Sequence, residues 1–185
     1  DLRRGAVDGS VEQQVQRRPI HPGTFVFVRA GTVHAILGGT LICEIQQSSD
    51  TTYRLWDWNR QPPRELHVEE SIEVINWSAP APALIETPPI GDLAGMRTLE
   101  ENEYFRVQVL DVQAGAQAQI PAEMLTHGCC VMVVAGSGTV AGTEGIVTLR
   151  TGQTAFVPAA CSDGIQIRST GGASLRVLIA ESLEV

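Results

Sequence analysis

The stretch of residues 22–60 restricts the fold most, because its pattern predicts short β-strands that end at glycine turns. Its first apolar run, Phe25–Val28, lies between a Pro-Gly dipeptide at 22–23 and Gly31, which is typical of a buried strand. His34 follows soon after the Gly31 turn. A rigid turn of this kind can aim an imidazole into a barrel, so His34 is a candidate metal ligand.

Two further strands are predicted in the same stretch. Residues 40–46 alternate between two faces, and Glu44 lies on the more polar one. Either Glu44 points into a barrel, where it can serve acid/base chemistry, or it points outward while the other face fills the core. A third strand is predicted over 51–58. It places Trp56 and Trp58 on one face, for stacking on a sugar or for packing.

Composition narrows the class of protein. The 185 residues are 43% hydrophobic, with 18 glycines and 10 prolines, which favours a soluble all-β fold with many turns. No apolar run approaches the ~20 residues of a membrane span, so no membrane partner is expected. The net charge is −8 and the 13 basic residues are all arginine without a large cluster, which argues against nucleic acid and excludes a Schiff-base lysine. The four cysteines lack CxxC spacing and no signal peptide precedes them, so we expect reduced thiols and a cytoplasmic location.

The sequence predicts three parts. Residues 1–78 carry a short N-terminal helical segment and the strands described above, and residues 79–97 form a proline-rich connector. Residues 98–185 are predicted to form a second barrel. This part repeats the first, but Asp163 stands where the first copy has His34. Its seven predicted strands are Tyr104–Val112, Gly128–Ala135, Gly138–Val140, Gly145–Leu149, Gln153–Val157, Gly164–Arg168 and Ser174–Ile179.

The residues around His34 resemble a known motif. Gly23, the Arg29-Ala30-Gly31 turn and His34 resemble the second conserved motif of the cupin barrels, with Arg29 where cupins usually have proline. The strings AGTVHAI, CEIQQSSDTTYRLWDWNR and RELHVEE follow one another over residues 30–70 and resemble the type I mannose-6-phosphate isomerases. The resemblance implies a mainly all-β fold with two cupin-like barrels. The metal-binding barrel is expected to be incomplete in this chain and the second barrel to be degenerate.

The same resemblance implies an activity and a set of site residues. It implies zinc-dependent interconversion of mannose 6-phosphate and fructose 6-phosphate through a cis-enediol, with His34 as one zinc ligand. The other ligands, a glutamine, a histidine and a glutamate, are expected upstream of this chain. Glu44 is the candidate acid/base residue, and Arg60 is the candidate for holding phosphate or enediolate charge. Arg64 and Trp58 are the candidate substrate-binding residues.

Other interpretations stay open at this point. One is that Arg60 is an ordinary loop residue paired with Asp57. Another is that the chain is a non-catalytic sugar-binding or regulatory cupin module, because the ligands expected upstream of His34 are missing from it. A third is a different metal cupin, but the strings EIQQSSDTTYR and DWNR favour the isomerases. The expected partner is a small sugar phosphate, and the oligomeric state is not predicted.

Overall fold

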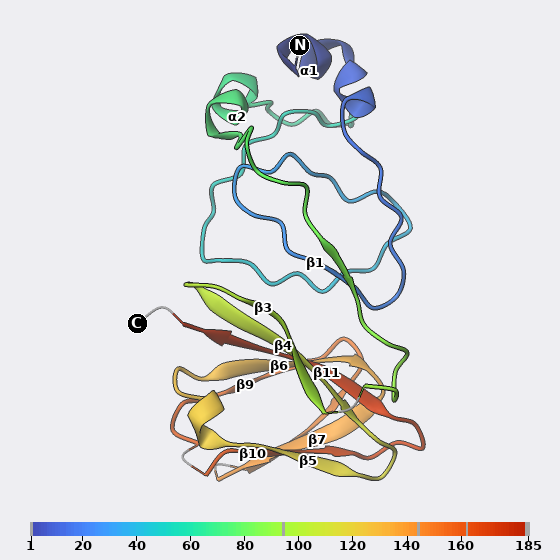
Figure 1. Ribbon diagram of the computed structural model, residues 1–185, viewed down its shortest axis with the longest axis vertical. Helices are drawn as coiled ribbons and strands as arrows, with labels where there is room; N and C mark the ends of the chain where they lie inside the picture. The colour runs from blue at the N-terminus through green and yellow to red at the C-terminus, as the bar shows by residue number, and fades with distance from the viewer. Residues whose placement is uncertain (1, 94, 144, 162, 184–185) are drawn as a thin grey trace. The chain divides into compact units, whose positions relative to one another are not determined.

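The computed structural model describes residues 2–93, 95–143, 145–161 and 163–183 and consists of two compact units (Figure 1). The first unit comprises residues 1–42 and 48–84, and the second comprises 43–47 and 85–185. The short segment 43–47 therefore groups with the C-terminal half of the chain. The three-part division predicted from the sequence stays a prediction.

The first unit contains short helices around a small apolar core. Its elements are α1 (Leu2–Asp8), the 3₁₀ helix η1 (Ser10–Gln13), β1 (Thr24–Val26) and α2 (Val68–Val74). Ala6, Val11 and Leu55 are buried at the centre, and Trp56 packs against them partly buried. The short helical segment predicted at the N-terminus is present. None of the described helices has the length and apolar content needed to cross a bilayer.

Residues 27–67 form no regular strand, which corrects the sequence prediction of strands over 40–46 and 51–58. Leu41 is 99% exposed and Cys43 is exposed, so these two positions of the predicted apolar face are not covered. An extended segment becomes a strand only when a neighbouring strand completes its backbone hydrogen bonds. The alternation is present in the sequence, but no described strand of the chain pairs with these residues.

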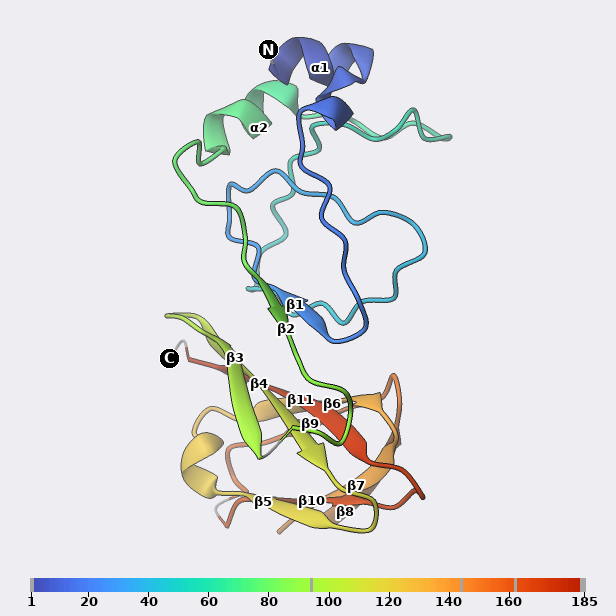
Figure 2. The ribbon, with the colours of Figure 1, turned by 45° about the vertical axis from the view of Figure 1, so that its right-hand side comes forward.

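The second unit is a sandwich of two antiparallel sheets, which form two layers in Figures 1 and 2. One sheet has the order β3 (Met96–Glu101), β4 (Phe105–Val112), β11 (Leu175–Ser182), β6 (Cys129–Ala135) and β9 (Thr154–Val157). The other has the order β5 (Gln117–Ile120), β10 (Ile165–Ser169), β7 (Ser137–Gly142) and β8 (Gly145–Arg150). Two short elements complete the description, β2 (Leu84–Glu86) before β3 and the 3₁₀ helix η2 (Ala122–Met124) after β5. All seven strands predicted for this part are present, and the mainly β fold is confirmed.

The core of the second unit lies between its two sheets. Val177 and Ile179 of β11 point into it, next to Val133 and Val131 of β6, their partners across the strand pair. Ile167 of β10 packs into the same core from the opposite sheet. Each of these side chains is at most 3% exposed. Because burying one such side chain stabilises a fold by about 1.5–3 kcal/mol, this core is the main source of stability in the second unit.

A buried ion pair lies on the other face of β4 and β11. Asp111 and Arg176 are partners across these strands, next to Leu110 and Val177, whose side chains are in the core. Side chains alternate between the two faces of a strand, so the ion pair points away from that core. Arg176 donates to Asp111 Oδ1 at 2.6 Å through Nε and to Oδ2 at 2.8 Å through Nη2. The side chains of Arg176 and Asp111 are 6% and 0% exposed.

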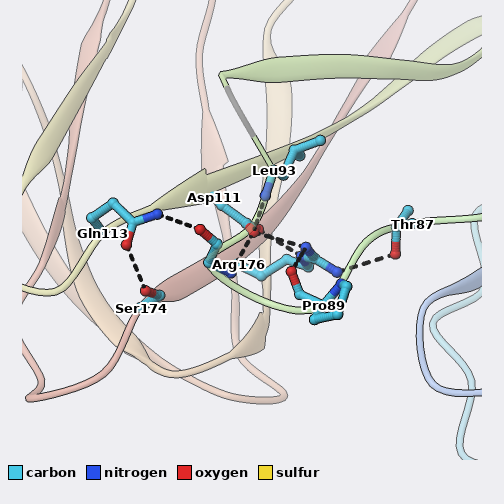
Figure 3. A network of polar contacts seen from close by, with 8 residues as sticks. Thr87, Pro89, Leu93, Asp111, Gln113, Ser174 and Arg176 are labelled. Carbon is cyan, nitrogen blue, oxygen red and sulfur yellow. Dashed lines mark hydrogen bonds and ion pairs between the residues drawn. The ribbon is translucent and has the colours of Figure 1, made fainter.

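The same ion pair fixes the segment 87–93 to the sheet, as Figure 3 shows. Arg176 donates to two oxygens of the segment, and Asp111 accepts from two of its N–H groups. The four partners are Thr87 Oγ1, the Pro89 carbonyl, and the N–H groups of Gly91 and Leu93, at 3.1, 3.2, 2.7 and 3.4 Å. Part of the predicted connector is therefore held by a network of hydrogen bonds to a buried ion pair.

We expect Asp111→Ala to lower the free energy of unfolding by about 3–5 kcal/mol, because it leaves Arg176 buried without its counter-ion. Urea denaturation followed by circular dichroism measures the change. Glu12→Ala is the matched control, since it breaks the solvent-exposed ion pair with Arg17 at 2.8 Å. For this control we expect a loss below about 1 kcal/mol. Equal losses for the two variants would contradict the importance given to burial.

The same pair predicts a loss of stability in acid. Burial raises the pKa of Asp111, but hydrogen bonds from Arg176 and from the N–H groups of Gly91 and Leu93 outweigh it and hold the pKa below its ordinary value. The stabilisation is therefore complete above the ordinary carboxyl pKa of about 3.9 and is lost as pH falls through the lower folded-state pKa. Asp111→Asn should reduce the slope of stability against pH below about pH 4, measured by urea denaturation at several pH values. An unchanged slope would show that this carboxylate does not limit stability in acid.

Candidate functional site

The loop of residues 57–64, called here the Asp57–Arg64 loop, is closed by an ion pair between its two ends. Arg64 Nε donates to Asp57 Oδ2 at 2.8 Å, and Arg64 Nη2 contacts Oδ1 of the same carboxylate. The Asp57 side chain is 13% exposed. The hydrogen bond from Arg64 is the main reason that the pKa of Asp57 lies below its ordinary value. Arg54 and Arg60 lower this pKa further through smaller electrostatic contributions.

Left-handed backbone bends the loop sharply. Trp58 and Asn59 have φ angles of 50° and 52°, a region that residues other than glycine and asparagine rarely adopt. The Arg60 N–H donates to the Asp57 carbonyl at 3.0 Å and closes the turn. This bend corrects a sequence prediction, because Trp56 and Trp58 do not lie on one face of a strand.

A small open hollow of about 110 Å³ lies beside this loop. It is lined by Trp56, Asp57, Asn59, Arg60, Pro63, Arg64 and Leu66. Arg60 is exposed, and its guanidinium makes no hydrogen bond or ion pair with the described part of the chain. Arg60 is therefore available to a dissolved anion, whereas Arg64 is already bonded to Asp57. The structure thus does not pair Arg60 with Asp57, which was one of the interpretations left open by the sequence.

Of the predicted site residues, Arg60 and Arg64 are brought together at this hollow. Trp58 is 46% exposed and is not among the described lining residues, whereas Trp56 is. Sequence reasoning missed Asn59, although asparagine tolerates left-handed backbone and so carried a usable signal for a bend. Trp58 carried no such signal, because tryptophan does not favour that conformation.

His34 lies in an exposed turn after Gly31, with its Nδ1 at 2.9 Å from the Thr32 carbonyl oxygen. Gly31 has a φ angle of 77°, and its carbonyl accepts from the Asn76 N–H at 2.9 Å. A Cβ at Gly31 would lie 2.6 Å from the Val74 carbonyl oxygen. Only glycine fits this position, so the close approach of the chain after α2 fixes the turn that precedes His34.

The described residues do not by themselves fit the zinc site that the sequence resemblance implies. Among residues 2–93, 95–143, 145–161 and 163–183, no group of three or more histidines, cysteines, aspartates or glutamates is placed to hold a metal ion. Zinc in proteins takes about four such ligands, and His34 offers one. We therefore derive no chemical step through a metal.

Glu44 is exposed and lies outside any strand, so the structure does not place it on the inward-facing strand that the sequence predicted. Its segment, 43–47, groups with the second unit, where Cys43 Sγ lies 3.5 Å from Met132 Sδ. His34 and Arg60 belong to the first unit. The roles of all three residues stay predictions.

Comparison with known proteins gives a consistent family name. The chain is 36% identical over 146 residues to a mannose-6-phosphate isomerase of Streptococcus mutans serotype c (strain ATCC 700610 / UA159). It is 35% identical over 155 residues to the mannose-6-phosphate isomerase ManA of Bacillus subtilis (strain 168). The chain is a homologue of the mannose-6-phosphate isomerases. This confirms the resemblance seen in the sequence. The two matches cover 76% and 81% of this chain but 44% and 48% of the relatives, so the chain spans about half of their length.

Solved structures similar to this isomerase homologue include cupins. An RmlC-like cupin protein from Desulfovibrio desulfuricans has a TM-score of 0.43 and 15% identity, over 55% of this chain and 99% of its own. An RmlC-like cupin family protein with a double-stranded β-helix fold from Methanocaldococcus jannaschii has a TM-score of 0.42 and 12% identity, over 52% and 86%. No family model matches the chain.

Gly31→Ala tests whether this glycine of the isomerase homologue fixes the turn before His34. Alanine there meets left-handed backbone, which costs about 1–2 kcal/mol, and also the Val74 carbonyl. Gly39→Ala is the matched control, because Gly39 has a φ angle of 85° but nothing within 4 Å of an added Cβ. We expect Gly31→Ala to lower the unfolding free energy by at least about 1 kcal/mol more than Gly39→Ala, measured by urea denaturation. Similar losses would show that the contact with Val74 is unimportant.

Proposed function

We propose that this chain takes part in the interconversion of mannose 6-phosphate and fructose 6-phosphate. The observation that carries the proposal is the identity of 36% and 35% to two proteins named as isomerases of that sugar phosphate, over most of this chain. The chain spans about half of those relatives, so the activity of a whole enzyme is part of the proposal. Arg60 supports it, because the substrate is an anion and the Arg60 guanidinium is exposed beside a hollow.

The reaction moves hydrogen within one sugar. A base removes the proton from C2, the electron pair forms the double bond of a cis-enediol, and the C1 carbonyl oxygen takes a proton. The C2 proton is then returned to C1 while the O2 hydroxyl loses its proton and becomes the ketone. No oxidant or reductant is needed. We assign the C2-to-C1 proton transfer to Glu44, since a carboxylate can accept and return a proton.

Arg60 is assigned to the negative charge of the substrate. A guanidinium presents a planar pair of donors that matches an enediolate or a phosphate group. Its place in a closed loop limits the conformations that it loses on binding. Trp58 is exposed enough to stack on the sugar. Arg64 lines the same hollow, but because it is bonded to Asp57 it offers no free pair of donors.

A second candidate function is a non-catalytic module that binds a sugar phosphate. The exposed position of Glu44, outside any strand, favours it. Such a module keeps the anion site at Arg60 and needs neither a base nor a metal. It differs from the enzyme in one measurable respect, because it binds the sugar phosphate without converting it.

Turnover of mannose 6-phosphate and its binding by calorimetry test both candidates on the chain as given. For the enzyme we expect Arg60→Ala to lower kcat/KM by about 100-fold or more, as loss of a donor to developing negative charge does in other enzymes. Arg150→Ala, an exposed arginine outside the hollow, should leave both readouts unchanged. Binding that depends on Arg60 without turnover supports the module. If the chain shows neither binding nor turnover, both candidates are contradicted.

Metal content of the same samples separately tests the expectation, taken from the sequence resemblance, that His34 is a zinc ligand. Stoichiometric zinc that disappears in His34→Ala would support His34 as a ligand. Zinc that is unaffected by His34→Ala would remove His34 from the proposed site, whatever the activity.

A further inference from the structure

One carboxylate in the candidate site faces three arginines. Asp57 is bonded to Arg64, and the positive charges of Arg54 and Arg60 also act on its pKa. Arg60 is three residues from Asp57, and its N–H is bonded to the Asp57 carbonyl at 3.0 Å. The two side chains therefore start from the same tight turn. An Arg60–Asp57 ion pair is the obvious local alternative to the pair that the structure contains.

Arg64 occupies the carboxylate so completely that this alternative does not form. It bonds both oxygens of Asp57, Oδ2 through Nε at 2.8 Å and Oδ1 through Nη2. A bidentate pair of this kind satisfies the carboxylate in one plane and neutralises its charge. The remaining charge beside the hollow is then positive, because Arg60 keeps no counter-ion within the described residues.

We propose that Arg64 is a positioning residue that holds Asp57 away from Arg60 and so keeps the Arg60 guanidinium free for the phosphate or enediolate of the substrate. The inference rests on the proposed function for the identity of the anion. The competition between Arg60 and Arg64 for the Asp57 carboxylate is argued from the geometry of the chain without ligand. It gives Asp57 a role as well, as the group whose charge has to be neutralised.

A purely structural role for Arg64 makes a different prediction. If the ion pair only closes the loop, every variant that lacks it is equally impaired. If Arg64 acts by occupying Asp57, impairment needs a free carboxylate at position 57. Arg64→Ala leaves that carboxylate free, whereas the double variant Asp57→Asn with Arg64→Ala lacks both the ion pair and the charge.

The first experiment measures the Arg60 guanidinium by NMR in the ligand-free chain labelled with ¹³C,¹⁵N-arginine. Its signal is assigned by its loss in Arg60→Lys. We expect fast rotation about the Cζ–Nη bonds in the original chain, slowed rotation in Arg64→Ala, and fast rotation again in the double variant. Rotation that does not slow in Arg64→Ala overturns the inference. Rotation that slows equally in both variants also overturns it.

The second experiment titrates the same variants with inorganic phosphate by calorimetry. We expect Arg64→Ala to weaken binding about fivefold, as an exposed ion pair of typical strength would, and the double variant to recover it. Equal weakening in both variants assigns Arg64 to loop closure alone and overturns the inference. Arg60→Ala separates the two proposals: if it leaves phosphate binding unchanged, the proposed anion role of Arg60 fails, while the NMR result still decides which arginine holds Asp57.

Discussion

Backbone hydrogen bonding between neighbouring strands is the constraint on which this structure depends. In the sandwich each strand lies beside an antiparallel partner, and this ladder directs alternate side chains into the core between the sheets. The ladder also brings Asp111 opposite Arg176, although the two are far apart in the sequence. Outside the sandwich, residues 27–67 have no such partner among the described strands. Their conformation depends on turns, on isolated backbone hydrogen bonds such as that from the His67 N–H to the Arg54 carbonyl, and on single side-chain contacts.

The Asp57–Arg64 loop holds its conformation without hydrogen bonds between paired strands. An ion pair closes it, left-handed backbone at Trp58 bends it, and one backbone hydrogen bond completes the turn. Arg64 is 45% exposed, so water and salt screen this pair far more than the buried pair of Asp111 and Arg176. The ion pair that closes the candidate site therefore contributes less to stability than the buried pair does.

Sequence pattern predicted those features that depend on local chemistry or on a partner that the chain contains. All seven strands predicted for the second unit form, because their neighbours lie within the same unit. Residues 40–46 have an equally clear alternation and form none, since a pattern does not reveal whether a partner strand is present. Asp57 pairs with Arg64 in a loop that bends at Trp58, and no property of tryptophan predicts that bend from the sequence.

The buried network around Arg176 has a consequence for how the sandwich can be fused to other proteins. Thr87, Pro89, Gly91 and Leu93 precede the first strand of the sandwich, yet their polar groups complete the hydrogen bonding of the Arg176–Asp111 ion pair on one of its sheets. A gene fusion that joined a foreign domain at Met96 would discard those groups and leave the guanidinium short of acceptors. The stretch of chain needed to satisfy this ion pair is therefore longer than the sandwich and begins at Thr87.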